Sequence, residues 1–171
     1  MAGENAGSDQ NRAVDQFVEV AHRIVWCTMA TVDPLGRPRS RVVHPVWERD
    51  ESGITGWVVS RRTPLRQTHL RHSGYVSCSY WDPQHDVAVA ECAADWLTDP
   101  AERARVWEFL ATPPPPLGWD PISIFPGGPQ DEAAGIIRLT PWRLSSRLAP
   151  DFAAGRAPTV WRAADRLSSI A

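Results

Sequence analysis

The sequence predicts a mainly β protein, a small closed barrel of about six antiparallel strands with a few helices. Three observations favour this class. Short runs rich in Val, Ile, Trp and Thr recur along the chain, tight turn sequences separate many of them, and helical patterns interrupt them only occasionally. With 171 residues, 43% of them hydrophobic, the chain is long enough to bury one core.

The first element is expected to be an amphipathic helix over residues 11–25. Val14, Phe17 and Ala21 recur there at spacings of three and four, as one buried helix face requires. Residues 1–10 are small and polar, and they lack the basic and apolar regions of a signal peptide. They are therefore expected to form a flexible arm.

Strands are predicted where β-branched and aromatic residues alternate with small or polar ones between turn signals. The turn sequences Asp-Pro-Leu-Gly, Asp-Glu-Ser-Gly and Asp-Pro-Gln-His suit hairpins. The six strands are expected over residues 26–32, 37–48, 54–60, 75–81, 86–98 and 135–147.

Two further helices are expected over residues 63–74 and 99–111. Thr63 and Asp99 are good N-cap residues, and each precedes a proline, which suits the first helical position. The Pro/Gly-rich residues 112–130 are expected to be irregular.

The domain organisation follows from these elements. Residues 11–147 are expected to form one domain, preceded by the arm over 1–10 and followed by a tail over 148–171. The tail is rich in Pro, Ala and Gly and holds one helical candidate, residues 159–167. It is expected to lie near a partner subunit.

Composition excludes several function classes. A net charge of −2 argues against general nucleic-acid binding, which requires a clearly basic domain. No apolar run approaches the roughly 20 residues that span a bilayer. The chain contains no Lys, which excludes any mechanism through a lysine Schiff base.

Cysteine and histidine usage offers little chemistry. Cys27, Cys78 and Cys92 lack metal-binding spacing, so buried reduced thiols in a cytoplasmic protein are expected, with a disulfide or a catalytic thiol as the alternatives. His69 and His72 share a helix face, but no third ligand is placed to complete a zinc site, and no metal is expected.

Basic residues are concentrated in one segment. Residues 37–72 hold 8 of the 18 basic residues and only 3 of the 20 acidic ones. Part of the cluster precedes or begins the helix at Thr63, and a helix N-terminus presents free N–H groups and a positive dipole. We interpret the basic cluster as a pocket for a phosphate-bearing cofactor; the alternative is a solvated helix face.

Four motifs follow one another in order: Pro-Arg-Ser-Arg at 38–41, Ser-Arg-Arg-Thr-x-x-Arg at 60–66, Tyr-Val-Ser-Cys at 75–78 and Thr-Pro-Trp-Arg at 140–143. Together with the order of the elements, they resemble the pyridoxamine 5′-phosphate oxidase-like split-barrel family, which includes flavin- and deazaflavin-dependent oxidoreductases. The resemblance implies a six-stranded Greek-key split barrel. It also implies a homodimer with two flavin sites at the subunit interface.

The resemblance further implies roles for individual residues. Phosphate contacts fall to Arg41 and Arg66, the latter where the family usually has a lysine. The segment that would pass along the flavin edge is Val42, Val43, His44 and Pro45. The segment that would hold phosphate and ribityl oxygens is Val59, Ser60 and Arg61. Val87 would face the ring from the other subunit, and Trp142 would also approach the ring.

The implied function is hydride transfer between the cofactor and a small conjugated substrate. FMN is the family default, and the deazaflavin coenzyme F-420 is the alternative. A non-catalytic flavin- or heme-binding carrier, store or sensor is a second hypothesis, and a structural dimer with a vacant pocket is a third. The chain lacks the C-terminal Arg/His segment that binds substrate in pyridoxamine 5′-phosphate oxidase itself, so that activity is not expected.

Overall fold

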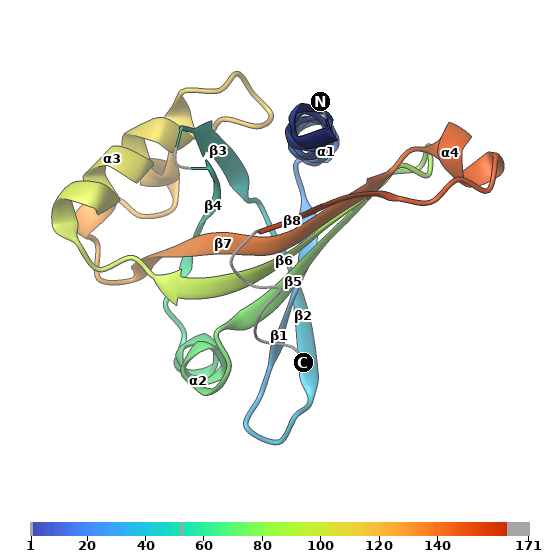
Figure 1. Cartoon of the computed structure of the whole chain (residues 1–171). Coiled ribbons are helices and arrows are strands. Elements are labelled where there is room, and N and C mark those ends of the chain that lie inside the picture. The colour runs from blue at the N-terminus through green and yellow to red at the C-terminus, as the bar shows by residue number, and fades with distance from the viewer. Residues whose placement is uncertain (1, 52, 164–171) are drawn as a thin grey trace.

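The structure is a computed structural model that describes residues 2–51 and 53–163, with side chains from residue 7 onward (Figure 1). The helices are α1 (Ala2–Ile24), α2 (Pro64–His72), α3 (Pro100–Ala111) and α4 (Ala149–Ala153), with short 3-10 turns η1 (Pro121–Ser123) and η2 (Gly128–Gln130). The strands are β1 (Cys27–Val32), β2 (Pro38–Val43), β3 (Val46–Asp50), β4 (Gly53–Arg61), β5 (Tyr75–Trp81), β6 (Val87–Trp96), β7 (Ala134–Arg147) and β8 (Thr159–Arg162). The mainly β class predicted from the sequence is confirmed.

The strands form one antiparallel sheet in the order β2-β1-β5-β6-β7-β4-β3, and β8 pairs with β7. Strands β2 and β3 lie at opposite ends of this order, yet only His44 and Pro45 separate them along the chain. Two residues span less than about 10 Å, so the sheet must curl until its end strands meet at this link. No ladder joins β2 to β3 in the described residues, so the barrel stays open along the rest of that seam.

The predicted helix starts are present with their caps. The Thr63 hydroxyl accepts a hydrogen bond from the backbone N–H of Arg66, and the Asp99 carboxylate accepts one from the N–H of Glu102 at 2.8 Å. At the β1–β2 turn, Gly36 has a φ of +75°, a conformation that glycine adopts without steric cost.

One hydrophobic core fills the barrel and is covered by α1. Phe17 of α1 packs edge-on against Trp47 and Tyr80, with ring centroids 5.0 and 6.2 Å apart. The indole N–H of Trp47 donates to the Tyr80 hydroxyl at 2.9 Å, so both buried polar groups are satisfied. A second cluster packs α3 against the outside of β3, β4 and β7 through residues that include Val106 and Leu110.

Two predictions for the N-terminal half are wrong. Helix α1 begins at Ala2, where a flexible arm was expected over residues 1–10, because a helix anchored by its buried C-terminal half can extend into polar sequence. The single strand expected over 37–48 is two strands. Pro45 lacks the N–H that a continuing ladder needs, and the chain breaks there.

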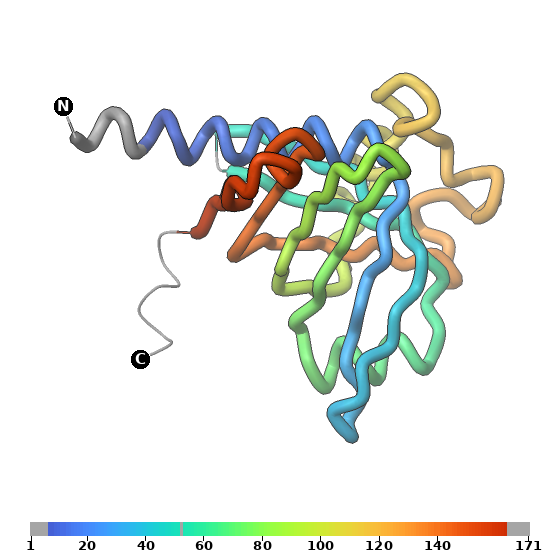
Figure 2. The backbone as a smooth tube through the Cα atoms, turned by 90° about the vertical axis from the view of Figure 1, so that its right-hand side faces the viewer, coloured from blue at the N-terminus to red at the C-terminus, as the bar shows by residue number. Residues whose placement is uncertain are grey.

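Regular structure continues beyond residue 147, into the segment expected to be a tail. Residues 149–162 form α4 and β8, and the four pairs between β8 and β7 extend the sheet. Trp161 packs against the barrel core, and Figure 2 shows this segment running beside α1. The helix expected over 159–167 is a strand as far as Arg162, and its last residues lie outside the described part of the chain.

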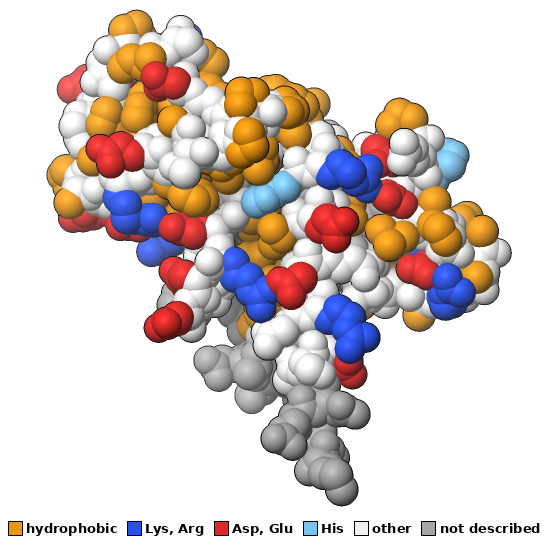
Figure 3. Space-filling model, turned by 90° about the horizontal axis from the view of Figure 1, so that it is seen from above, with side chains coloured by type: hydrophobic (Ala, Val, Ile, Leu, Met, Phe, Trp, Pro, Cys, Tyr) orange, Lys and Arg blue, Asp and Glu red, His pale blue; other side chains and the backbone are white. Residues whose placement is uncertain are grey.

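No helix among the described residues is long and apolar enough to cross a membrane. The view from above α1 shows hydrophobic side chains gathered at the end that carries α3 and at the end that carries α4, with Arg and acidic side chains between them (Figure 3). Both ends of the molecule therefore expose apolar surface.

A half-buried histidine gives the fold a pH dependence. His22 of α1 accepts a hydrogen bond from the backbone N–H of Trp47 at 3.0 Å, and burial together with the nearby His44 lowers the pKa of His22. The unfolded chain, whose histidines titrate near a pKa of about 6.5, therefore binds more protons than the folded chain below that pH.

We expect stability to fall as pH is lowered from 7.5 to 5.5, and to fall less steeply in the His22→Gln variant. Gln keeps an acceptor for Trp47 but does not titrate, whereas His44 still does. Urea unfolding at several pH values measures both slopes. Identical slopes in the two proteins would contradict this origin of the pH dependence.

Candidate functional site

The basic cluster contains two arginines without a counter-charge. Arg41 of β2 and Arg66 of α2 are half-buried, and neither forms an ion pair within the described part of the chain. Burial lowers the pKa of Arg66, and the nearby charge of Arg41 lowers it further. Burial also lowers the pKa of Arg41, with a contribution from Arg39. Two like charges are thus held near one another at a cost in free energy.

Both guanidinium groups have unused hydrogen-bonding capacity. Nη1 of Arg66 donates to the Arg61 carbonyl at 3.0 Å, but its Nε is buried without a partner among the described residues. Nη1 of Arg41 is also buried and unpartnered there. Native structures rarely bury such donors unsatisfied, so this pair is suited to an anion that accepts from both.

Arg61 lies differently from its two neighbours. Its guanidinium carbon sits 5.4 Å from the ring centroid of Phe125, a cation–π contact with the loop before β7. Ser60, the residue before it, pairs with Gly135 of β7 and faces the pocket described next. The Arg61 backbone supports Arg66, while the Arg61 side chain supports the loop.

A pocket of about 310 Å³ is lined by residues that neighbour Arg41 and Arg61 in the chain. It lies at the barrel seam, because the link between β2 and β3 and the end of β4 supply much of its wall. Its lining is mostly apolar, with few polar groups, which is typical of small-molecule sites. The lining residues are Trp26, Val42, Val43, His44, Val59, Ser60, Pro116, Trp119 and Ile124.

The structure therefore brings together five residues predicted for the cofactor. Val42, Val43, His44, Val59 and Ser60 line one pocket. Val42 is 68% exposed, an unusual state for a valine on a strand. Arg41 precedes Val42 and Arg61 follows Ser60 along their strands, but neither arginine lines the pocket.

Besides the three arginines, the predicted residues Pro45, Val87 and Trp142 do not line this pocket. Pro45 is buried in the link behind it. Val87 lies at the start of β6 in a separate hollow of about 550 Å³, beside Trp81 and Phe152. Trp142 occupies a bulge of β7, where the register against β6 shifts, and its indole Nε1 is buried without a partner in the described residues.

Sequence reasoning missed the contribution of the loop after α3. Pro116, Trp119 and Ile124 come from the segment predicted only as irregular. Arg103 of α3 fixes the end of this segment, because its guanidinium donates to the carbonyls of Pro129, Leu97 and Ala134 at 2.8, 3.4 and 3.2 Å. The tryptophan within a Pro/Gly-rich run was the only available signal.

His44 is the most constrained polar group of the pocket. It is 9% exposed and lies between Trp26 and Trp119, with ring centroids at 5.0 and 6.1 Å. Burial lowers the pKa of His44, while a hydrogen bond to the Leu117 backbone opposes that shift. The imidazole is therefore neutral near pH 7.

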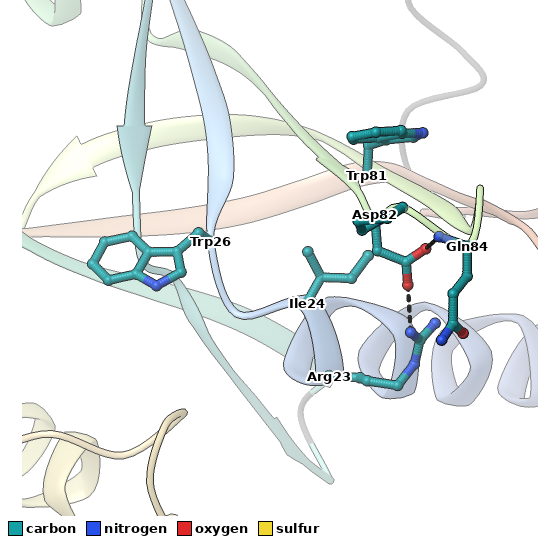
Figure 4. A pocket seen from close by; sticks show the side chains of 7 residues that line it. Arg23, Ile24, Trp26, Trp81, Asp82 and Gln84 are labelled. Carbon is teal, nitrogen blue, oxygen red and sulfur yellow. Dashed lines mark hydrogen bonds and ion pairs between the residues drawn. The ribbon is translucent and has the colours of Figure 1, made fainter.

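A larger hollow of about 450 Å³ lies beside the pocket and shares Trp26 with it (Figure 4). Arg23 is paired there with Asp82, and its Nη2 contacts Asp86 at 2.6 Å. This guanidinium is neutralised, in contrast to Arg41 and Arg66. The hollow is bounded at its other end by Trp81, which is 57% exposed.

The remaining candidate groups are structural. Nδ1 of His69 lies 2.9 Å from the Thr31 hydroxyl, and the described residues contain no cluster of three or more potential metal ligands. Cys27, Cys78 and Cys92 are buried and free. Burial raises the pKa of the Cys92 thiol, which disfavours the reactive thiolate.

Similarity to solved structures identifies the fold. No protein-family model matches the sequence, and a comparison with curated proteins finds no match. Among solved structures, a protein of Clostridium acetobutylicum related to general stress protein 26, of the pyridoxinephosphate oxidase family, is similar with a TM-score of 0.64 and 12% identity. That similarity covers 86% of this chain and 94% of the other.

Two further structures extend this similarity. A pyridoxamine 5′-phosphate oxidase-related, FMN-binding protein of Nostoc punctiforme has a TM-score of 0.54 at 13% identity, covering 80% and 84% of the two chains. An F-420 reductase has a TM-score of 0.53 at 18% identity, covering 75% and 95%. At this level of identity the shared property is the architecture: the chain has the split-barrel fold of the pyridoxamine 5′-phosphate oxidase-like proteins.

Proposed function

We propose that the chain binds a phosphorylated flavin or deazaflavin and acts as an oxidoreductase on a small conjugated substrate. The observation that carries this proposal is the pair of half-buried, uncompensated guanidinium groups of Arg41 and Arg66 beside an apolar pocket. A ligand with an anionic end and a planar end satisfies both parts. Similar folds include an FMN-binding protein and an F-420 reductase, which supports this class of ligand.

The donor set suits a phosphate. Arg41 and Arg66 offer unpartnered N–H groups. Thr63 marks the N-terminus of α2, whose dipole favours an anion. Arginine binds phosphate through two parallel hydrogen bonds, so Arg66 can replace a lysine at this place without loss of charge.

A bound flavin or deazaflavin would supply the hydride-transfer chemistry, and the protein would supply binding, orientation and exclusion of water. Val42, Val43 and Val59 provide an apolar wall for a ring. Ser60 also lines this pocket, where its hydroxyl can bind the polar chain that joins ring to phosphate. No proton-transfer pair is required for hydride transfer itself.

We propose FMN as the cofactor, with F-420 as the alternative. Both carry a phosphate and a planar ring. Pyridoxamine 5′-phosphate oxidase activity is not proposed, because residues 149–162 form α4 and a strand that pairs with β7 rather than an Arg/His substrate segment. The three free cysteines suit a reducing compartment, and we place the activity in the cytoplasm.

We also propose that the chain is a homodimer with a cofactor site at each end of the interface. A row of uncharged residues crosses the outer face of the sheet from β2 to β6 through aligned positions: Val42, Thr28, Ser79 and Val89. Small and apolar side chains without charge suit close packing of two identical sheet faces. The exposed Val42 belongs to both this face and the pocket.

The Arg66→Ala variant should bind FMN more weakly by about 1.5–3 kcal/mol, the range for hydrogen bonds to charged groups. Fluorescence titration measures the dissociation constant, and F-420 is titrated in parallel. Arg71→Ala is the matched control, because Arg71 lies on the same helix but is exposed. Equal constants for wild type and Arg66→Ala would remove Arg66 from the site.

A redox cycle separates an enzyme from a carrier. The loaded protein should be reduced by NAD(P)H or a deazaflavin reductant and then reoxidised by a conjugated substrate. Binding without such a cycle would favour the carrier hypothesis.

The Ser79→Arg variant should be monomeric under conditions where the wild type is dimeric, because it places a charge at the centre of the proposed interface. Sedimentation velocity at micromolar concentration measures the oligomeric state of both proteins. Thr98→Arg, an exposed position beyond the end of β6, serves as the control and should remain dimeric. A monomeric wild type, or a dimeric Ser79→Arg, would contradict the proposed interface.

A further inference from the structure

The loop after α3 holds one side chain rigidly at the pocket. The backbone N–H of Trp119 donates to the Leu110 carbonyl at the end of α3 at 3.0 Å, and Gly118 donates to Pro114 at 3.1 Å. A Cβ on Gly118 would lie 1.7 Å from the Pro113 carbonyl oxygen, so only glycine permits this close turn. Trp119 is therefore pre-positioned by backbone contacts and not by a ligand.

The polar edge of Trp119 is unused. Its Nε1 is buried and has no hydrogen-bond partner in the described part of the chain. An indole N–H is a donor only, so the missing partner must be an acceptor. Nε2 of His44 is also buried and unpartnered, and the two rings lie nearly parallel, with an interplanar angle of 22°. Two neighbouring nitrogens without partners are rare in a native interior.

The remaining lining around His44 and Trp119 is mostly apolar. The faces available to a ring come from Val42, Val59 and Ile124, which cannot bind an oxygen. A centroid separation of 6.1 Å leaves no room for a further ring between His44 and Trp119, so a ligand meets them with its edge. Apart from Ser60 and the exposed indole of Trp26, the polar side-chain contacts of such a ligand fall to His44 and Trp119.

We infer that Trp119 and His44 form a recognition edge for a ring carbonyl, and that the loop after α3 determines which planar ligands the pocket accepts. Trp119 donates to the carbonyl oxygen, and His44 contacts the neighbouring polar ring atom. The inference deepens the proposed function, in that the cofactor ring is one source of such an edge; a carbonyl-bearing substrate ring has the same chemistry. It does not depend on the arginine pair.

Two phosphate-free probes test this edge directly. Lumiflavin is a planar tricycle with ring carbonyls, and phenazine is a planar tricycle without any. The wild-type protein should prefer lumiflavin over phenazine by tenfold or more. Trp119→Phe should lower that preference about fivefold to tenfold, because one hydrogen bond is lost while the aromatic surface remains.

Trp26→Phe is the matched comparison, because it makes the same chemical change in the same pocket at an indole that is 57% exposed. It should leave the ratio of the two affinities unchanged. An unchanged ratio in Trp119→Phe would overturn the inference. If that variant does not fold, the indole N–H resonance of Trp119 in wild type replaces it: the signal should move downfield with lumiflavin and not with phenazine, and an unmoved signal would overturn the inference.

Titration with FMN identifies the source of the ring. If Trp119→Phe lowers the affinity for FMN as well as for lumiflavin, the edge binds the cofactor ring. If the variant lowers only the affinity for lumiflavin, the edge binds a substrate ring. Failure of the phosphate proposal has a different signature: Arg66→Ala would leave FMN binding unchanged, while the preference for lumiflavin over phenazine and its reduction in Trp119→Phe would persist.

Discussion

The two-residue link at His44 and Pro45 determines where the barrel closes and where its pocket forms. It forces strands at opposite ends of the sheet order to meet, and so it closes the barrel at one point only. The open seam beside the link becomes a pocket, because the walls supplied by β2 and β4 lie next to each other without pairing. The same geometry sets Arg41 one residue before the pocket wall.

The distribution of charge around the pocket is uneven. Elsewhere in the described chain many arginines are neutralised by carboxylates, as Arg23 is by Asp82 and Asp86. Arg41 and Arg66 keep their charges near each other without such compensation, which the fold must stabilise through its other contacts. An apolar pocket with a cationic end selects for ligands that are planar at one end and anionic at the other.

The sequence predicted the fold class and most strands and revealed the concentration of arginines, because hydrophobic alternation, caps and charge are local signals; the role of those arginines in a site stays a prediction. It could not place Trp119 or Ile124 at the pocket, since an aperiodic loop reveals its destination only through tertiary contacts such as those of Arg103. It also misassigned β8. That short strand is defined by pairing with β7, as between Trp161 and Leu144, and its own sequence strongly favours neither helix nor strand.

We propose that the uncompensated arginine pair binds the phosphate of a planar redox cofactor. FMN and riboflavin differ only in that phosphate, so their affinities for the wild-type protein isolate its contribution. FMN should bind at least about tenfold more tightly, as expected for charge-assisted hydrogen bonds. Equal affinities for the two ligands would contradict this proposal.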